Sequence, residues 1–135
     1  MTKGELAQYI DHTLLKPNAT IKDIKKLCDE AKEYGFYSVC VNPRYVTYAK
    51  KCLKNSPVKV ACVVGFPLGE STPEIKQLEA MLAKKDGADE LDVVASISSI
   101  VMGEYDYLFN EIMQIVEDTK IPVKVILETF LVQTP

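Results

Sequence analysis

The chain has 135 residues, of which 47% are hydrophobic and 26% charged, as in ordinary soluble globular domains. Its net charge of −3 and dispersed lysines argue against a nucleic acid or an anionic membrane as a partner. The four cysteines lack a C-x-x-C pair and only one histidine is present, so we expect no metal and no cofactor. A polar N-terminus and the lack of a long apolar run predict a cytoplasmic protein.

Strand and helix patterns alternate along the chain. After a short helix at 6–10, strands are expected at 10–15, 37–41, 58–64, 88–94 and 122–129, and helices at 20–34, 45–53, 71–86 and 105–118. Thr20 is a candidate N-cap, Gly35 a candidate helix end, and Ser71 or Thr72 a cap before Pro73. Residues 95–103 are expected to be a loop or a strand extension. Leu108, Ile112, Ile115 and Val116 are expected to face inward from the last helix.

This alternation predicts one α/β domain over residues 1–135 with five parallel strands. Ligands of parallel α/β proteins bind where the strands end. The polar residues expected near those ends are Asp11, Thr13, Lys16, Cys40, Asn42, Glu90, Asp92, Lys124 and Glu128. His12 is interpreted as a buried, hydrogen-bonded histidine, and the other cysteines as core residues.

Asp92 and Lys124 are each flanked by apolar residues in successive strands, and we expect their side chains to be close, near the C-terminal ends of adjacent strands. A charge in a buried strand needs a partner or a cavity. Such a pair suits proton transfer or a tuned amine, and it equally suits a structural ion pair inside a barrel. The residues alone leave both interpretations open.

Several segments together resemble deoxyribose-phosphate aldolases, class I aldolases built on a (β/α)8 TIM barrel. The matching stretches are IDHTLLKP at 10–17, SVCVNP at 38–43, VVGFPLG at 63–69 with STPEIK at 71–76, GADELDVV at 87–94 and VKVILET at 123–129. The resemblance implies half of a TIM barrel, with a flattened, flavodoxin-like open sheet as the alternative. It implies cleavage of 2-deoxyribose 5-phosphate to glyceraldehyde 3-phosphate and acetaldehyde through a Schiff base, without a metal.

By this resemblance, Asp92 matches the aspartate of the proton relay. Lys124 matches a lysine beside the Schiff-base lysine, whose pKa a neighbouring cation lowers. Asp11, Thr13 and Cys40 match residues of the substrate pocket. The segment ASISS at 95–99 departs from the family, which usually has an Asn and a Gly there, and the tail at 130–135 departs as well.

The family places its Schiff-base lysine on strand six, its relay lysine on strand seven and its phosphate site in the last loops. We therefore expect this chain to correspond to an N-terminal portion without substantial activity alone. The alternative function is a non-catalytic half-barrel scaffold that self-assembles. Open strand edges and an uncovered sheet face predict a homo-oligomer, with Phe130, Leu131 and Val132 as candidate interface residues.

Overall fold

The protein is described by a computed structural model that covers residues 1–132. Within this range five strands form one parallel sheet in the order β1-β2-β3-β4-β5. The strands are β1 (Asp11–Leu14), β2 (Ser38–Val41), β3 (Lys59–Val64), β4 (Glu90–Val94) and β5 (Val123–Ile126). The helices are α1 (Lys3–Ala7), α2 (Ile21–Tyr34), the 3₁₀ turn η1 (Pro43–Tyr45), α3 (Val46–Cys52), α4 (Pro73–Asp86), α5 (Ile97–Met102) and α6 (Tyr105–Thr119).

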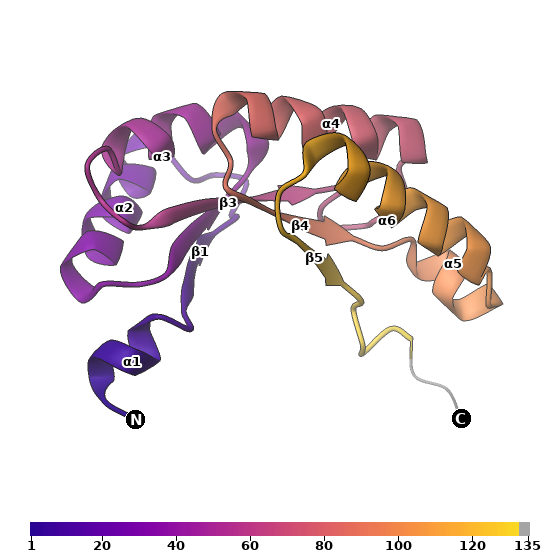
Figure 1. The fold of residues 1–135 in the computed structure, drawn as a ribbon, viewed down its shortest axis with the longest axis horizontal. Helices are drawn as coiled ribbons and strands as arrows, with labels where there is room; N and C mark the ends of the chain where they lie inside the picture. Colours follow the sequence, from indigo (N-terminus) through magenta and orange to yellow (C-terminus); the bar gives the residue numbers. More distant parts are fainter. Residues whose placement is uncertain (133–135) are drawn as a thin grey trace.

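Helices α2, α3, α4 and α6 lie along the same face of the sheet, which arches beneath them (Figure 1). A contact across the sheet shows its curvature. Flat strands spaced at about 4.8 Å would place β1 and β5 about 19 Å apart, yet Nζ of Lys124 in β5 lies 3.0 Å from Oδ2 of Asp11 in β1. The sheet is therefore half of a barrel. The flavodoxin-like alternative is wrong, because that fold has the order 2-1-3-4-5 and helices on both faces.

The main core lies between the sheet and these helices. Alternate strand residues point toward the helices, as the two-residue period of a strand requires. They pack on apolar side chains of the helices, and all of the following are buried: Val39, Val41, Val60, Cys62, Val64, Leu91 and Val93 from the strands, and Ile24, Leu27, Ala31, Ala80, Ala83 and Ile115 from the helices. The other strand face carries only a small apolar cluster of Cys40, Ala61 and Val63, with Leu15 beside it.

The expected boundaries of α2 are confirmed by its caps. The side-chain oxygen of Thr20 accepts a hydrogen bond from the Asp23 amide, Asp23 accepts one from the Thr20 amide, and Gly35 ends the helix in the left-handed conformation. Thr72 occupies the N-cap position of α4 and Pro73 begins the helix, as expected, although the Thr72 side chain makes no capping hydrogen bond.

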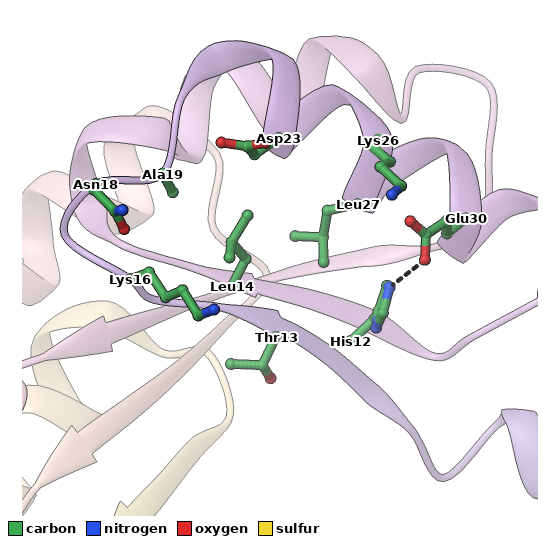
Figure 2. Close-up of a pocket in the computed structure, with 10 residues that line it drawn as sticks. All are labelled: His12, Thr13, Leu14, Lys16, Asn18, Ala19, Asp23, Lys26, Leu27 and Glu30. Atoms are coloured by element: carbon green, nitrogen blue, oxygen red, sulfur yellow. Dashed lines mark hydrogen bonds and ion pairs between the residues drawn. The ribbon is translucent and has the colours of Figure 1, made fainter.

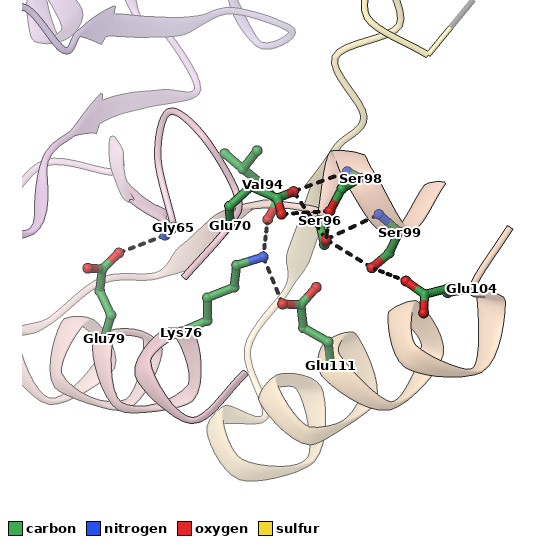
Figure 3. A network of polar contacts seen from close by, with 10 residues as sticks. All are labelled: Gly65, Glu70, Lys76, Glu79, Val94, Ser96, Ser98, Ser99, Glu104 and Glu111. Carbon is green, nitrogen blue, oxygen red and sulfur yellow. Dashed lines mark hydrogen bonds and ion pairs between the residues drawn. The ribbon is translucent and has the colours of Figure 1, made fainter. Parts of the chain in front are cut away.

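The interpretation of residues 95–103 as loop or strand extension was wrong, because this segment contains helix α5. The Ser96 side chain accepts a hydrogen bond from the Ser99 amide and caps the helix. The Glu70 carboxylate accepts hydrogen bonds from the Ser98 amide and hydroxyl, which ties the start of α5 to the loop after β3 (Figure 3). The contacts of Glu70 with Ser98 join residues far apart in the sequence, so the local pattern did not indicate them.

The buried face of α6 also differs from the expected one. Ile115 is buried as expected, and Leu108 and Ile112 are partly buried, but Val116 is exposed. The residues fully inside are Glu111, Ile115 and Thr119, which recur at four-residue spacing. A carboxylate at the centre of this face had not been expected from the sequence.

Glu111 faces Lys76 of α4, and both side chains are fully buried (Figure 3). Lys76 Nζ lies 2.7 Å from Glu111 Oε1 and donates a 2.7 Å hydrogen bond to the carbonyl oxygen of Val94 at the end of β4. The contact to Glu111 is an ion pair, and neither carboxylate oxygen has a hydrogen-bond partner among the described residues. The pair thus links α4 and α6 to the C-terminal end of β4, beside the loop after β3.

Removing one partner of this pair should cost far more than removing both, because a lone buried charge has nothing to offset its lost hydration. We expect Lys76→Met to lower the free energy of unfolding by about 3–5 kcal/mol. Lys76→Met combined with Glu111→Leu should recover most of that loss. Urea denaturation of the three proteins measures this, and equal destabilisation in the single and double variants would contradict it.

Candidate active site on the inner face of the sheet

The candidate site residues lie on the strand face that points away from the helices. Residues paired across parallel strands point to the same side of a sheet, and the register pairs Thr13 with Cys40 and Asp92 with Lys124. Asp11 pairs with Ser38 in the same alternation. The curved sheet therefore brings the five predicted residues, Asp11, Thr13, Cys40, Asp92 and Lys124, to one concave inner face.

The ammonium group of Lys124 joins two carboxylates from different strands. Nζ lies 3.0 Å from Asp11 Oδ2 and 3.2 Å from Asp92 Oδ2. The expected closeness of Asp92 and Lys124 is confirmed. Both residues lie in the middle of their strands, however, and Asp11 opens β1, so their placement at strand ends was wrong. Adjacent strands bring Asp92 and Lys124 together, and the curvature of the sheet brings Asp11 to them.

The three charged groups differ in exposure. The Asp92 side chain is buried, with 7% of its surface exposed, whereas the Lys124 side chain is 57% exposed. Burial by itself lowers the pKa of Lys124, but the hydrogen bond and charge of Asp11 together with those of Asp92 outweigh it and raise the pKa above its ordinary value of 10.5. Lys124 is therefore a cation near neutral pH.

Asp11 is held in its charged form by two donors. Burial raises the pKa of this carboxyl, yet the hydrogen bond from Ser38 and the hydrogen bond and charge of Lys124 outweigh burial and leave the pKa below its ordinary value of 3.8. The Ser38 hydroxyl donates to Asp11 Oδ1 at 2.6 Å. Ser38 was not among the predicted site residues, although its place two residues before Cys40 puts it on the same face of β2.

Cys40 and Thr13 complete the inner face. The Cys40 thiol donates to Asp92 Oδ2 at 3.5 Å, and burial, with the nearby carboxylate, raises the pKa of this thiol. Cys40 is thus a neutral hydrogen-bond donor and a poor nucleophile. The Thr13 hydroxyl donates to the backbone oxygen of Asp11 at 2.8 Å.

The end of β4 is fixed by the loop after β3. Gly65 adopts a left-handed conformation with φ of 65°, and a Cβ there would come within 2.9 Å of Lys76 Cε. Gly69 has φ of 71°, and a Cβ there would meet the Ala95 carbonyl oxygen at 2.2 Å. These glycines let the loop lie against β4 and over the lysine that binds the Val94 carbonyl. They position the strand that carries Asp92.

Three further polar candidates make contacts outside the charged cluster. Glu90 accepts a 2.5 Å hydrogen bond from Tyr37 at the beginning of β4, and Asn42 donates to the Leu15 carbonyl. Glu128 follows β5 in a left-handed turn with φ of 50°. Within residues 1–132, the ion pairs of Lys124 are made with Asp11 and Asp92 and with none of these three.

A groove between β1 and α2 contains Lys16 (Figure 2). His12 points toward α2 there, and its Nε2 lies 3.2 Å from Glu30 Oε2, so it belongs to the opposite side of β1 from the charged cluster. His12 is hydrogen-bonded as expected, but only partly buried.

Residues 1–132 contain no group of three or more His, Cys, Asp and Glu side chains able to hold a metal ion. None of the helices in that range is long and apolar enough to cross a membrane. What the inner face offers is a fixed cation between two carboxylates, an arrangement that can move protons and bind a polar ligand.

Comparisons with known proteins identify relatives of this chain by sequence and by fold. The family model described as DeoC/LacD family aldolase matches residues 5–135. The deoxyribose-phosphate aldolase of Caldicellulosiruptor saccharolyticus is 57% identical over 134 residues, which cover 96% of this chain and 60% of that protein. That of Thermococcus kodakarensis is 54% identical, with coverage of 96% and 60%.

The solved structure of a tetrameric deoxyribose phosphate aldolase from Aeropyrum pernix superimposes with a TM-score of 0.88 at 38% identity, over 96% of this chain and 55% of that one. The half-barrel of parallel βα units and these matches place the chain among the barrel aldolases. The chain belongs to the DeoC/LacD aldolase family. It spans about 60% of the length of these curated relatives.

The charge state of Asp11 provides a test of the cluster. An NMR titration of the Asp11 carboxyl carbon should have its midpoint below 3.8, and Lys124→Met should move that midpoint upward. Because the pKa is depressed in the folded state, the stability it contributes is present above pH 3.8 and is lost as the pH falls through the depressed value. Lys25→Met, which removes a surface pair with Asp29, is the matched control and should leave Asp11 unchanged.

Proposed function

We propose that residues 1–135 are one α/β domain that forms the first five βα units of a deoxyribose-phosphate aldolase. The reaction is the cleavage of 2-deoxyribose 5-phosphate to glyceraldehyde 3-phosphate and acetaldehyde through a Schiff base, without a metal. The family match and the names of the relatives support this reaction. The observation that carries it is the Lys124 ammonium held between Asp11 and Asp92. The free cysteines fit a reducing, cytoplasmic location.

In this proposal Asp92 is the carboxylate of the proton relay. It lies on the inner face, hydrogen-bonded by Cys40 and paired with Lys124, so these two donors stabilise the carboxylate that remains when Asp92 gives up a proton. Lys124 places a permanent positive charge in the site, which lowers the pKa of a neighbouring amine and favours the neutral, nucleophilic form. Asp11, Thr13 and Cys40 line the substrate pocket.

Lys124 itself is a poor Schiff-base nucleophile, because two carboxylates hold it protonated. The family resemblance assigns that role and the second relay lysine to strands six and seven, which follow the five strands of this chain. We therefore propose that the chain alone forms part of the substrate site and does not cleave the substrate at a substantial rate.

A chimera tests the proposed reaction. This chain would replace the corresponding 60% of the Caldicellulosiruptor saccharolyticus aldolase, and cleavage of 2-deoxyribose 5-phosphate would be followed by the acetaldehyde released. We expect activity in the chimera and a loss of kcat of roughly 100-fold or more in its Asp92→Asn variant. Lys16→Met, in the groove on the other side of β1, is the control and should keep the activity. A folded chimera with unchanged kcat after Asp92→Asn would contradict the role of Asp92.

A self-assembling half-barrel is the second candidate function, and exposed apolar side chains favour it. The inner-face cluster of Cys40, Ala61 and Val63 is itself buried and adds no exposed surface. Phe130 and Leu131, by contrast, are largely exposed. We infer that the chain forms a homo-oligomer, in keeping with the tetrameric state of the Aeropyrum pernix aldolase. Val132, the third predicted interface residue, is partly buried.

Sedimentation velocity over a range of concentrations tests self-association. We expect species heavier than the 15.1 kDa chain, with a population that grows as concentration rises. A folded monomer across the whole range would contradict the homo-oligomer.

A further inference from the structure

Helix α4 carries its large apolar side chains on the side that faces away from the sheet. The residues turned inward and buried are Lys76, Ala80 and Ala83. The outward stripe contains Ile75, Leu78, Met81 and Leu82, whose exposed fractions are 54%, 55%, 46% and 49%. A helix that only covers a sheet buries its large apolar residues and exposes charges. In α4 this distribution is reversed.

Helix α2 shows the usual arrangement, whereas α6 shares part of the reversal, with Tyr105 and Phe109 exposed and Glu111 buried. Helix α2 has the same length of 14 residues and buries Ile24, Leu27, Cys28 and Ala31. Its exposed residues are mostly charged, and its exposed large apolar residues, Ile21 and Tyr34, stand at its two ends. The outward stripe of α4 is therefore an unpartnered apolar surface about 11 Å long from Ile75 to Leu82, given 1.5 Å per residue.

Charged residues of opposite sign stand at the two ends of this stripe. Glu74 is in the first turn and Lys85 in the last turn, and both are exposed. The spacings from Glu74 to Leu78, Met81 and Lys85 are those of neighbours along one helix face. Glu74 and Lys85 are equally distant from the midpoint between Leu78 and Met81. Two antiparallel copies of the stripe related by a two-fold axis at this midpoint therefore place Glu74 of each copy opposite Lys85 of the other.

We propose that the outward stripe of α4, comprising Glu74, Ile75, Leu78, Met81, Leu82 and Lys85, is the surface on which a second copy of this chain docks. The two α4 helices pack antiparallel across a two-fold axis. Leu78 of each copy meets Met81 of the other, and Glu74 of each copy faces Lys85 of the other. A parallel arrangement would instead place like charges together. This inference rests on the homo-oligomer proposed above and assigns its contact surface.

A groove beside the stripe gives the second copy a place to insert side chains. It lies between η1 and α4 and is lined by Pro43, Arg44, Ile75, Leu78 and Leu82, among others. Helices pack by placing ridges of one into grooves of the other. An isologous contact of this kind closes after two copies, because each stripe is used once.

The dissociation constant of the wild-type chain and its variants, measured by sedimentation equilibrium, tests the surface. Leu78→Glu should raise the constant by roughly 100-fold, because a two-fold axis places the new charge in the interface twice. Glu74→Lys and Lys85→Glu should each raise it by roughly 5-fold. The double variant Glu74→Lys with Lys85→Glu should return it to nearly the wild-type value, since opposite charges again face each other.

An exposed aromatic residue outside the stripe provides the control. Phe109→Glu on α6 alters a side chain that is 64% exposed, and it should leave the constant unchanged. If the wild type associates and Leu78→Glu does not weaken it, or if the charge swap fails to restore it, the α4 surface is wrong and the homo-oligomer stands. A folded wild type that stays monomeric overturns both.

Discussion

One-sided cover of the sheet is the constraint on which the rest of the structure depends. Helices α2, α3, α4 and α6 pack on the same face of five consecutive parallel strands (Figure 1). The strand residues on that face form the core, and the alternate residues are left for the concave inner face. A flat sheet covered on both sides would have no room for charged groups inside it. Curvature with an open interior makes the charged cluster possible.

The cluster works because its charges compensate one another. Lys124 is held between Asp11 and Asp92, and each carboxylate has a further donor, Ser38 for Asp11 and Cys40 for Asp92. This compensation also defines what the cluster can do. A lysine kept protonated by two carboxylates is an electrostatic and proton-transfer group, whereas a Schiff base needs a neutral amine. In the function proposed above, the five strands supply the charged part of the site.

Much of this could be predicted from the sequence where the signal was local. Period-two strands, the Thr20 cap and Gly35 gave the order and approximate bounds of the elements, and the family resemblance gave the inner-face residues. Long-range contacts were missed. Helix α5 depends on Glu70, and the buried face of α6 depends on the match between Lys76 and Glu111. The charge of Glu111 argued against its true inward position, because only its distant partner makes burial tolerable.

The charge state and role of Lys124 are tested most directly by trapping with acetaldehyde and borohydride, read by mass spectrometry of the peptide that contains it. The account predicts that the isolated chain leaves Lys124 unmodified at neutral pH, while the full-length Caldicellulosiruptor saccharolyticus aldolase forms a stable adduct under the same conditions. A stoichiometric adduct on Lys124 of the isolated chain would contradict it, because that lysine would then be a neutral nucleophile.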